Sequence, residues 1–148
     1  MPAYIQNLNQ VVFSTKYRRP VLLKANRKRL YAYFWALFKK HNCHLYRVGG
    51  IEDHTHFIFK LHPSVAVADL VKNIKTESNK FIKREELFPD FTCWQVKYSW
   101  FTYAQEAQDN LVRYVANQEA HHRKENSKDE LRRMLEEAGV KYKEEYLD

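Results

Sequence analysis

Two histidines stand on either side of Thr55, in a segment that reads HTHFIFKL. Its β-branched and aromatic residues favour a strand, in which successive side chains point to opposite faces. His54 and His56 would then share one face, while Thr55 and Phe57 occupy the other. Two imidazoles this close on a rigid strand could bind one cation, although strand histidines without a ligand role are more common. The pattern predicts half of a metal site.

A second candidate group lies in the segment NLVRYVANQ, where Tyr114 and Gln118 are four residues apart. Helical geometry would place this phenol and this amide on one face. A tyrosine hydroxyl can act as a nucleophile when its proton is removed. A tyrosine at helical spacing more often packs its ring in a core, so the segment alone does not establish a nucleophile.

The charge balance points to a polyanionic partner. The chain has 25 Lys and Arg residues against 18 Asp and Glu, with a formal charge of +7. Such an excess attracts nucleic acid first of all. Some basic side chains could follow phosphates, or could equally form a solvated charged face. These candidates are Lys16, Arg18 and Arg19 after the first expected strand, and Lys72, Lys75, Lys80 and Lys83 on the second expected helix.

Other classes of site and location find no support in the sequence. Cys43 and Cys93 form no CxxC motif and are expected to be buried, reduced thiols rather than zinc ligands. The N-terminal residues lack a basic stretch followed by an apolar one, and no run approaches the about 18 apolar residues of a membrane span. We therefore expect a cytoplasmic protein.

The elements that would position these residues follow from periodicity and turn signals. A strand is expected over 8–15, a helix over 25–41, a strand over 43–48, a turn at Gly49-Gly50 and Glu52-Asp53, and a strand over 54–61. A second helix over 65–83 and a strand over 94–103 complete the order β-α-β-β-α-β. This is the ferredoxin-like order of an α+β fold, with an antiparallel sheet and both helices on one of its faces.

Two further helices are expected beyond this core. One spans 104–122 and carries Tyr114, while Ser127 and Glu130 form a capping-box pattern that would open a last helix ended by Gly139. The length of the chain suits one domain. We expect that domain to span 1–148, with a core over about 1–103, the tyrosine helix over 104–122, and a C-terminal helix and tail over 127–148.

Three segments together resemble the single-tyrosine HUH transposases of the insertion sequence 200/605 group. They are the run VVFSTKYRRPVL at 11–22, DHTH at 53–56 and YVANQ at 114–118. The resemblance covers nearly the whole chain in the expected order. It departs at Thr55, where the family usually has a bulky hydrophobic residue, and at Gln10, where many relatives carry a histidine.

The resemblance implies a DNA transposase that cuts and rejoins single-stranded DNA. By similarity to the family, His54, His56 and Gln118 would hold a divalent cation, Mg²⁺ or Mn²⁺. Tyr114 would attack the phosphorus and form a 5′-phosphotyrosine intermediate. Asp53 could orient a histidine or join the metal shell, although turn chemistry is the more common reason for an acidic residue in a hairpin turn.

The implied partners are single-stranded DNA with hairpin ends and a second copy of the chain. In such a homodimer, the tyrosine helix of one subunit can complete the site of the other. Two other functions remain open: a host-adapted nickase that processes hairpins, and an inactive module that binds DNA or RNA hairpins. A ferredoxin-like domain that binds small molecules or metals for regulation would leave the tyrosine helix unexplained.

Overall fold

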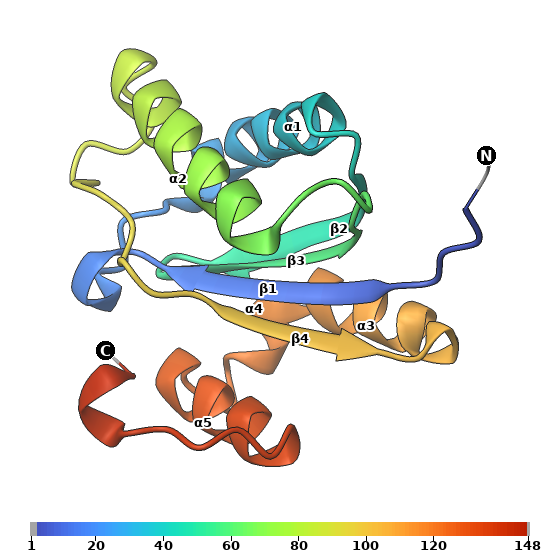
Figure 1. Cartoon of the computed structure of the whole chain (residues 1–148). Coiled ribbons are helices and arrows are strands. Elements are labelled where there is room, and N and C mark those ends of the chain that lie inside the picture. The colour runs from blue at the N-terminus through green and yellow to red at the C-terminus, as the bar shows by residue number, and fades with distance from the viewer. Residues whose placement is uncertain (1–2, 148) are drawn as a thin grey trace.

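A four-stranded antiparallel sheet forms the middle layer of the computed structural model, which describes residues 3–147 (Figure 1). Its strands are β1 (Leu8–Ser14), β2 (His44–Ile51), β3 (His54–Lys60) and β4 (Ser99–Tyr103), in the spatial order β2-β3-β1-β4. The helices α1 (Lys24–Lys40) and α2 (Val67–Arg84) cover one face. The predicted α+β fold and its β-α-β-β-α-β order are confirmed.

The other face of the sheet is covered as well. It carries α3 (Gln108–Ala116), α4 (Gln118–His121) and α5 (Ser127–Glu137), and short 3-10 turns occupy Lys16–Arg18, Gln105–Ala107 and Glu144–Tyr146 (Figure 1). Chemistry placed on this second face is therefore enclosed between the sheet and the C-terminal helices.

None of the helices within residues 3–147 combines the length and apolarity needed to cross a membrane.

An aromatic core fixes the first helical layer on the sheet. Phe57 of β3 lies under Phe34 of α1, with ring centroids 4.8 Å apart, and Phe13 of β1 meets Trp94 at 4.9 Å. Burial of each such side chain stabilises the fold by about 1.5–3 kcal/mol. The strand alternation that buries Phe57 here turns the neighbouring histidines to the opposite face, as predicted.

The glycine pair is not a turn. Gly49 and Gly50 belong to β2, which continues to Ile51, and the hairpin turn falls at Glu52-Asp53. A Cβ at Gly49 would lie 2.4 Å from the backbone oxygen of Val115 in α3. The prediction of a turn at Gly49-Gly50 was wrong because Gly49 serves the close approach of a helix rather than a change of chain direction.

The fourth strand is shorter than the predicted 94–103. Trp94 makes only an isolated bridge with Thr15, and β4 begins at Ser99. Between them, the Lys75 ammonium donates to the carbonyl oxygens of Gln95, Val96 and Lys97 at 2.6, 3.0 and 2.9 Å. These carbonyls bind a side chain of α2 instead of a neighbouring strand, which is why the ladder starts later.

The predicted tyrosine helix over 104–122 is divided. A 3-10 turn leads into α3, and Asn117, with φ −100° and ψ 23°, separates α3 from α4. Asparagine favours such non-helical positions because its side chain competes for backbone hydrogen bonds. Tyr114 therefore lies on α3, whereas Gln118 opens α4.

The last helix begins and ends within a residue or two of the predicted signals, but its cap is different. Asn126 is the N-cap and its side chain accepts from the Asp129 amide at 2.8 Å, so the capping box of Ser127 and Glu130 was wrong. Gly139 follows the helix with φ +71°, and the Val140 amide donates to the Leu135 oxygen at 2.9 Å, which is the expected glycine-based end. The Glu130 side chain therefore takes no part in capping the helix.

Candidate active site

The residues predicted to do chemistry meet on the sheet face that α3, α4 and α5 cover. His54 and His56 are buried there, with 1% and 0% of their surface exposed. Gln118 Oε1 lies 3.0 Å from His54 Nε2, and the ring centroids of His56 and Tyr114 are 6.0 Å apart. One chain therefore brings its own tyrosine helix to its own histidine pair.

The carboxylate of Glu130 lies at the centre of this group. Its Oε1 is 3.0 Å from His56 Nε2 and 3.3 Å from both His54 Nε2 and His122 Nε2. Burial alone would raise the pKa of Glu130, but hydrogen bonds with His122, His54 and His56 hold it far below its usual range. The carboxylate is ionised.

Each imidazole in the group is oriented by an acceptor at its other nitrogen. The Nδ1 atoms of His54, His56 and His122 lie 2.7, 2.8 and 2.6 Å from Asp53 Oδ1, Gln10 Oε1 and the Glu125 backbone oxygen. A backbone oxygen and an ionised carboxylate can only accept, and the Gln10 amide uses its nitrogen to donate to Tyr103 at 2.8 Å. In the neutral form, each imidazole keeps its proton on Nδ1 and directs the lone pair of Nε2 toward Glu130.

Such an arrangement fits a cation. One ligand atom each from His54, His56, His122 and Glu130 lies within 4.8 Å of all the others. Lone pairs that face one another repel unless protons or a positive ion lie between them. Histidines whose Nδ1–H is held by a carboxylate or carbonyl are typical of metal sites. The donor set therefore suits a divalent metal and includes His54 and His56, two of the three ligands that the resemblance implies.

Protons can fill the same role in the metal-free chain. Burial by itself would lower the pKa of His54, but hydrogen bonds with Asp53 and Glu130 raise it to about 9. Burial outweighs the Glu130 contact at His56, whose pKa is lowered. Asp53 also accepts from Ser127 Oγ at 2.8 Å, so the predicted partner of the histidine is itself held in place by α5.

The hydroxyl of Tyr114 lies at the edge of this polar centre. It donates to Glu130 Oε2, accepts from Arg133 at 3.0 Å, and is 3.4 Å from His121 Nε2. Burial raises the pKa of Tyr114, and the Glu130 charge raises it further. The phenol is protonated at neutral pH, with the Arg133 guanidinium and one proton acceptor, Glu130, within reach, since His121 Nε2 faces the Glu125 carboxylate at 2.7 Å.

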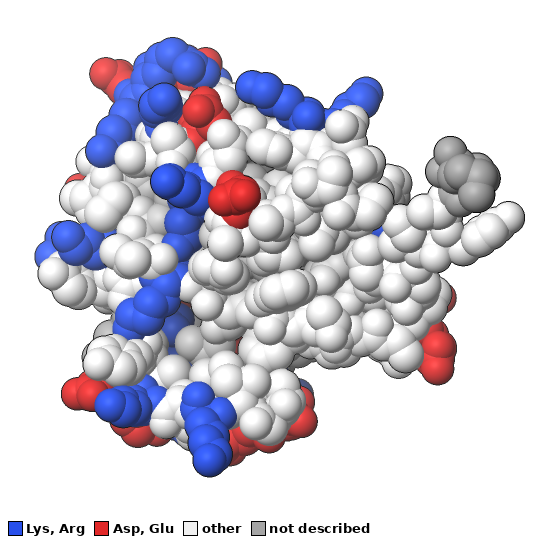
Figure 2. Space-filling view, viewed as in Figure 1, with Lys and Arg blue, Asp and Glu red and all other residues white. Residues whose placement is uncertain are grey.

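The predicted phosphate-binding residues have different surroundings. Lys16 and Arg19 are exposed beside β1, and Lys72, Lys80 and Lys83 are exposed on α2, across the sheet from the histidines. Lys75 instead holds the segment before β4, and burial lowers its pKa to about 8. Figure 2 shows Lys and Arg gathered along one side of the molecule, from α2 to the C-terminal segment.

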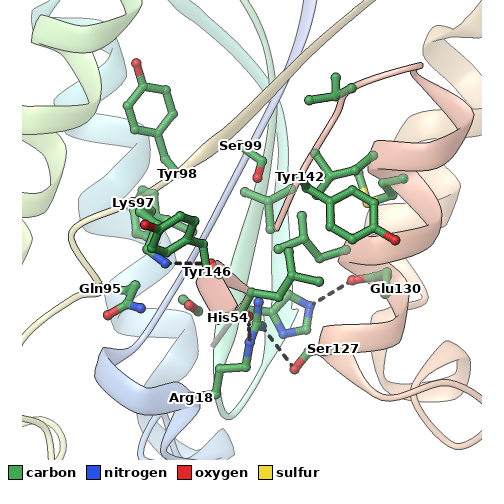
Figure 3. A pocket seen from close by; sticks show the side chains of 18 of the residues that line it. Arg18, His54, Gln95, Lys97, Tyr98, Ser99, Ser127, Glu130, Tyr142 and Tyr146 are labelled. Atoms are coloured by element: carbon green, nitrogen blue, oxygen red, sulfur yellow. Dashed lines mark hydrogen bonds and ion pairs between the residues drawn. The ribbon is translucent and has the colours of Figure 1, made fainter. Parts of the chain in front are cut away.

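A cavity of about 580 Å³ opens beside His54 (Figure 3). His54, Glu130 and Arg18 lie on its wall, and Arg18 Nε donates to the Leu147 oxygen at 2.8 Å. Its lining also includes aliphatic side chains such as Met134 and Leu135, and three tyrosines, one just before β4 and two near the C-terminus: Tyr98, Tyr142 and Tyr146. The cavity combines aromatic surface with positive charge next to the polar centre.

Four residues of the site were not predicted: His121, His122, Glu130 and Arg133. Glu130 matched a capping box, and the two histidines matched no ligand position. A signal for His122 existed, because it follows Gln118 by four residues and so shares its helical face. No local pattern marked Glu130 or Arg133, because their contacts with Tyr114 depend on how α5 packs.

Comparisons with known proteins identify the family and the fold. The sequence model of the family described as "Transposase IS200 like" matches residues 4–118. Among solved structures, a candidate transposase from Deinococcus radiodurans R1 superposes with a TM-score of 0.60 at 19% identity, over 80% of this chain and 95% of that one. A REP-associated tyrosine transposase bound to a REP hairpin gives 0.60 at 14% identity, over 82% of this chain and 74% of that one.

At these identities the solved structures establish the shared fold, and no curated protein sequence matched the chain. The family model, in contrast, matches the sequence of this chain, and the matched residues include His54, His56, Tyr114 and Gln118. The chain belongs to the family of IS200-like transposases.

Proposed function

We propose that this chain cuts and rejoins single-stranded DNA with Tyr114 as its nucleophile. The observation that carries the proposal is the contact of the Tyr114 hydroxyl with Glu130, whose other oxygen lies 3.0 Å from His56 Nε2. The phenol and the candidate metal ligands thus share one polar centre. The family match supports a transposase, and this contact supports its chemistry.

In the proposed step, Tyr114 Oη forms a bond to the phosphorus of a backbone phosphodiester, and the bond from phosphorus to the 3′ oxygen breaks. The 3′ oxygen leaves and takes up a proton to become a free hydroxyl. The 5′ phosphate stays on Tyr114 as a phosphotyrosine, which conserves the bond energy for rejoining. A 3′ hydroxyl of another end reverses the step.

The phenol must lose its proton as it attacks. Glu130 Oε2 is the acceptor within reach, because His121 Nε2 faces the Glu125 carboxylate at 2.7 Å. The Arg133 guanidinium stabilises the negative charge that develops on the phenolate oxygen. His54, His56 and Gln118 would hold Mg²⁺ or Mn²⁺, with Asp53 orienting His54. When bound, such an ion polarises the phosphate and offsets the negative charge of the transition state.

We propose single-stranded DNA with hairpin ends as the substrate. One similar structure is described as bound to a REP hairpin, which supports a hairpin for this chain as well. The exposed cations on one side of the molecule could follow its phosphates (Figure 2). The cavity beside His54 could receive unpaired bases against its tyrosines. The candidate phosphate contacts are Lys16, Arg18, Arg19, Lys72, Lys80 and Lys83.

A homodimer is part of the proposal. Exchange of the α3 segment between two copies would assemble the same contacts between Tyr114 and Glu130 or His56. Light scattering would measure the mass, and mixing Tyr114→Phe with His56→Asn would test exchange. Recovered cleavage in the mixture would support an exchanged dimer, whereas a monomer or an inactive mixture would assign the site to one chain.

The test of the function uses labelled single-stranded DNA carrying the hairpin ends that flank the gene. We expect an adduct of protein and DNA that survives denaturation and disappears in Tyr114→Phe and with a chelator. Tight hairpin binding without an adduct would favour an inactive binding module instead. An adduct that forms without strand transfer to a second DNA end would favour a hairpin-processing nickase.

A further inference from the structure

Two side chains beyond the span of the family match point at the metal site that the proposed function requires. His122 follows α4 and Glu130 lies in α5, and the match ends at Gln118. His122 Nε2 lies 2.9 Å from Gln118 Oε1 and 3.3 Å from Glu130 Oε1. Only 2% of the Glu130 side chain and 4% of the His122 side chain are exposed.

The spacing of the atoms is that of neighbouring ligands around one ion. Metal to nitrogen or oxygen bonds of about 2.0–2.2 Å place adjacent ligand atoms about 3.0–3.4 Å apart. Glu130 Oε1 is 3.0 Å from His56 Nε2 and 3.3 Å from the Nε2 atoms of His54 and His122. Gln118 Oε1 completes the group at 3.0 Å from His54 Nε2.

The outer contacts supply an independent argument. The Nδ1 of His122 lies 2.6 Å from the backbone oxygen of Glu125, which can only accept, so this imidazole directs its Nε2 lone pair inward like the two on β3. In their neutral forms, the three imidazoles then direct three lone pairs at an ionised carboxylate between the sheet and α5. A positive ion satisfies all four groups at once.

We propose that Glu130 and His122 are ligands of the metal, together with His54, His56 and Gln118, so that the ion is held by three imidazoles, a carboxylate and an amide. This inference rests on the proposed function for the presence of a metal. Nitrogen-rich sites favour transition-metal ions over Mg²⁺, which prefers oxygen and water. The set therefore selects an ion such as Mn²⁺ or Co²⁺ over Mg²⁺.

The arrangement would also place the nucleophile. Glu130 Oε1 faces the imidazoles, while Oε2 accepts from the Tyr114 hydroxyl and from Gln118 Nε2 at 3.1 Å. One carboxylate would then connect the ion to the attacking phenol. The alternative is that Glu130 only occupies the space of the substrate phosphate and competes with the metal for the imidazoles.

The first experiment measures metal binding to the full chain without DNA. Isothermal titration with MnCl₂ and MgCl₂ would compare the wild type with Glu130→Gln, His122→Asn and the control Glu136→Gln, an exposed carboxylate on the same helix. We expect Mn²⁺ to bind at least about tenfold more tightly than Mg²⁺. We expect each of the two ligand variants to weaken Mn²⁺ binding by at least about tenfold, and the control to have no effect.

Unchanged or tighter Mn²⁺ binding in Glu130→Gln would overturn the proposal and assign Glu130 to occlusion of the site. Because this variant could fail to fold, wild-type crystals soaked in Mn²⁺ provide a second measurement. An anomalous peak within bonding distance of His56, His122 and Glu130 is expected. A peak outside bonding distance of Glu130 would overturn the proposal, while the Tyr114 adduct tests the cleavage function separately.

Discussion

Gly49 of β2 allows α3 to lie directly against the sheet, and we predict that Gly49→Ala displaces the helix that carries Tyr114. The added Cβ would lie 2.4 Å from the Val115 oxygen and 3.0 Å from Val115 Cγ1. A helix backbone cannot turn away as a flexible side chain does. Restoring the 3.4 Å of an ordinary contact requires a retreat of α3 by about 1 Å.

Both stability and activity should fall. Overpacking of this kind costs about 1–3 kcal/mol of unfolding free energy. Tyr114 precedes Val115 in α3, so its hydroxyl moves with the helix relative to His56 and Glu130. A displacement of about 1 Å at a reacting group can cost about 100-fold in rate. We therefore expect adduct formation to slow by about 10- to 100-fold.

Urea unfolding would measure the stability, and single-turnover adduct formation would measure the rate. Gly139→Ala is a matched control, because φ at Gly139 is +71° and its added Cβ meets nothing within 4 Å. It should lose about 1–2 kcal/mol through backbone strain while keeping the adduct rate. Wild-type stability and rate in Gly49→Ala would refute the packing argument. Lost stability with an unchanged rate would show that the position of α3 does not limit attack.

Three further predictions concern groups away from the reacting atoms. Thr55→Val should raise the unfolding free energy by about 1 kcal/mol in urea, because Thr55 Oγ1 is buried without a hydrogen-bond partner among residues 3–147; lower stability would contradict this. Burial raises the pKa of Tyr31 from 10.0 to about 12, so folding is favoured while the Tyr31 phenol is neutral. This contribution to the free energy of unfolding is fully present below pH 10 and is lost as the pH rises through 12. The wild type should therefore lose more unfolding free energy over this range than Tyr31→Phe, and parallel curves would argue against a buried phenol. Lys75→Met should lower the unfolding free energy by about 1–3 kcal/mol and speed amide exchange near β4, since three carbonyls lose their donor; unchanged exchange would show that the segment is held by other contacts.

The sequence alone determined which face of the sheet could do chemistry. Alternation along β3 separates His54 and His56 from Phe57, and the structure keeps that separation, with the phenylalanine in the aromatic core. The four-residue spacing of Tyr114 and Gln118 likewise predicted that their side chains lie together, and both contact Glu130 even though Asn117 interrupts the helix. These results are local, because a backbone period fixes the direction of each side chain once the element type is known.

Tertiary packing decided the rest of the site. Glu130 is 74 residues from His56 along the chain, yet its carboxylate lies 3.0 Å from that imidazole. Its local pattern fitted a helix cap, and Gly49 fitted a turn, because both patterns are compatible with several tertiary environments. The roles of these residues depend on the docking of α5 and α3 against the sheet, and that docking depends on side chains distant in sequence, such as Val12, Phe101 and Met134. Sequence periodicity specifies the direction of a side chain, whereas the packing of whole elements decides which groups it meets.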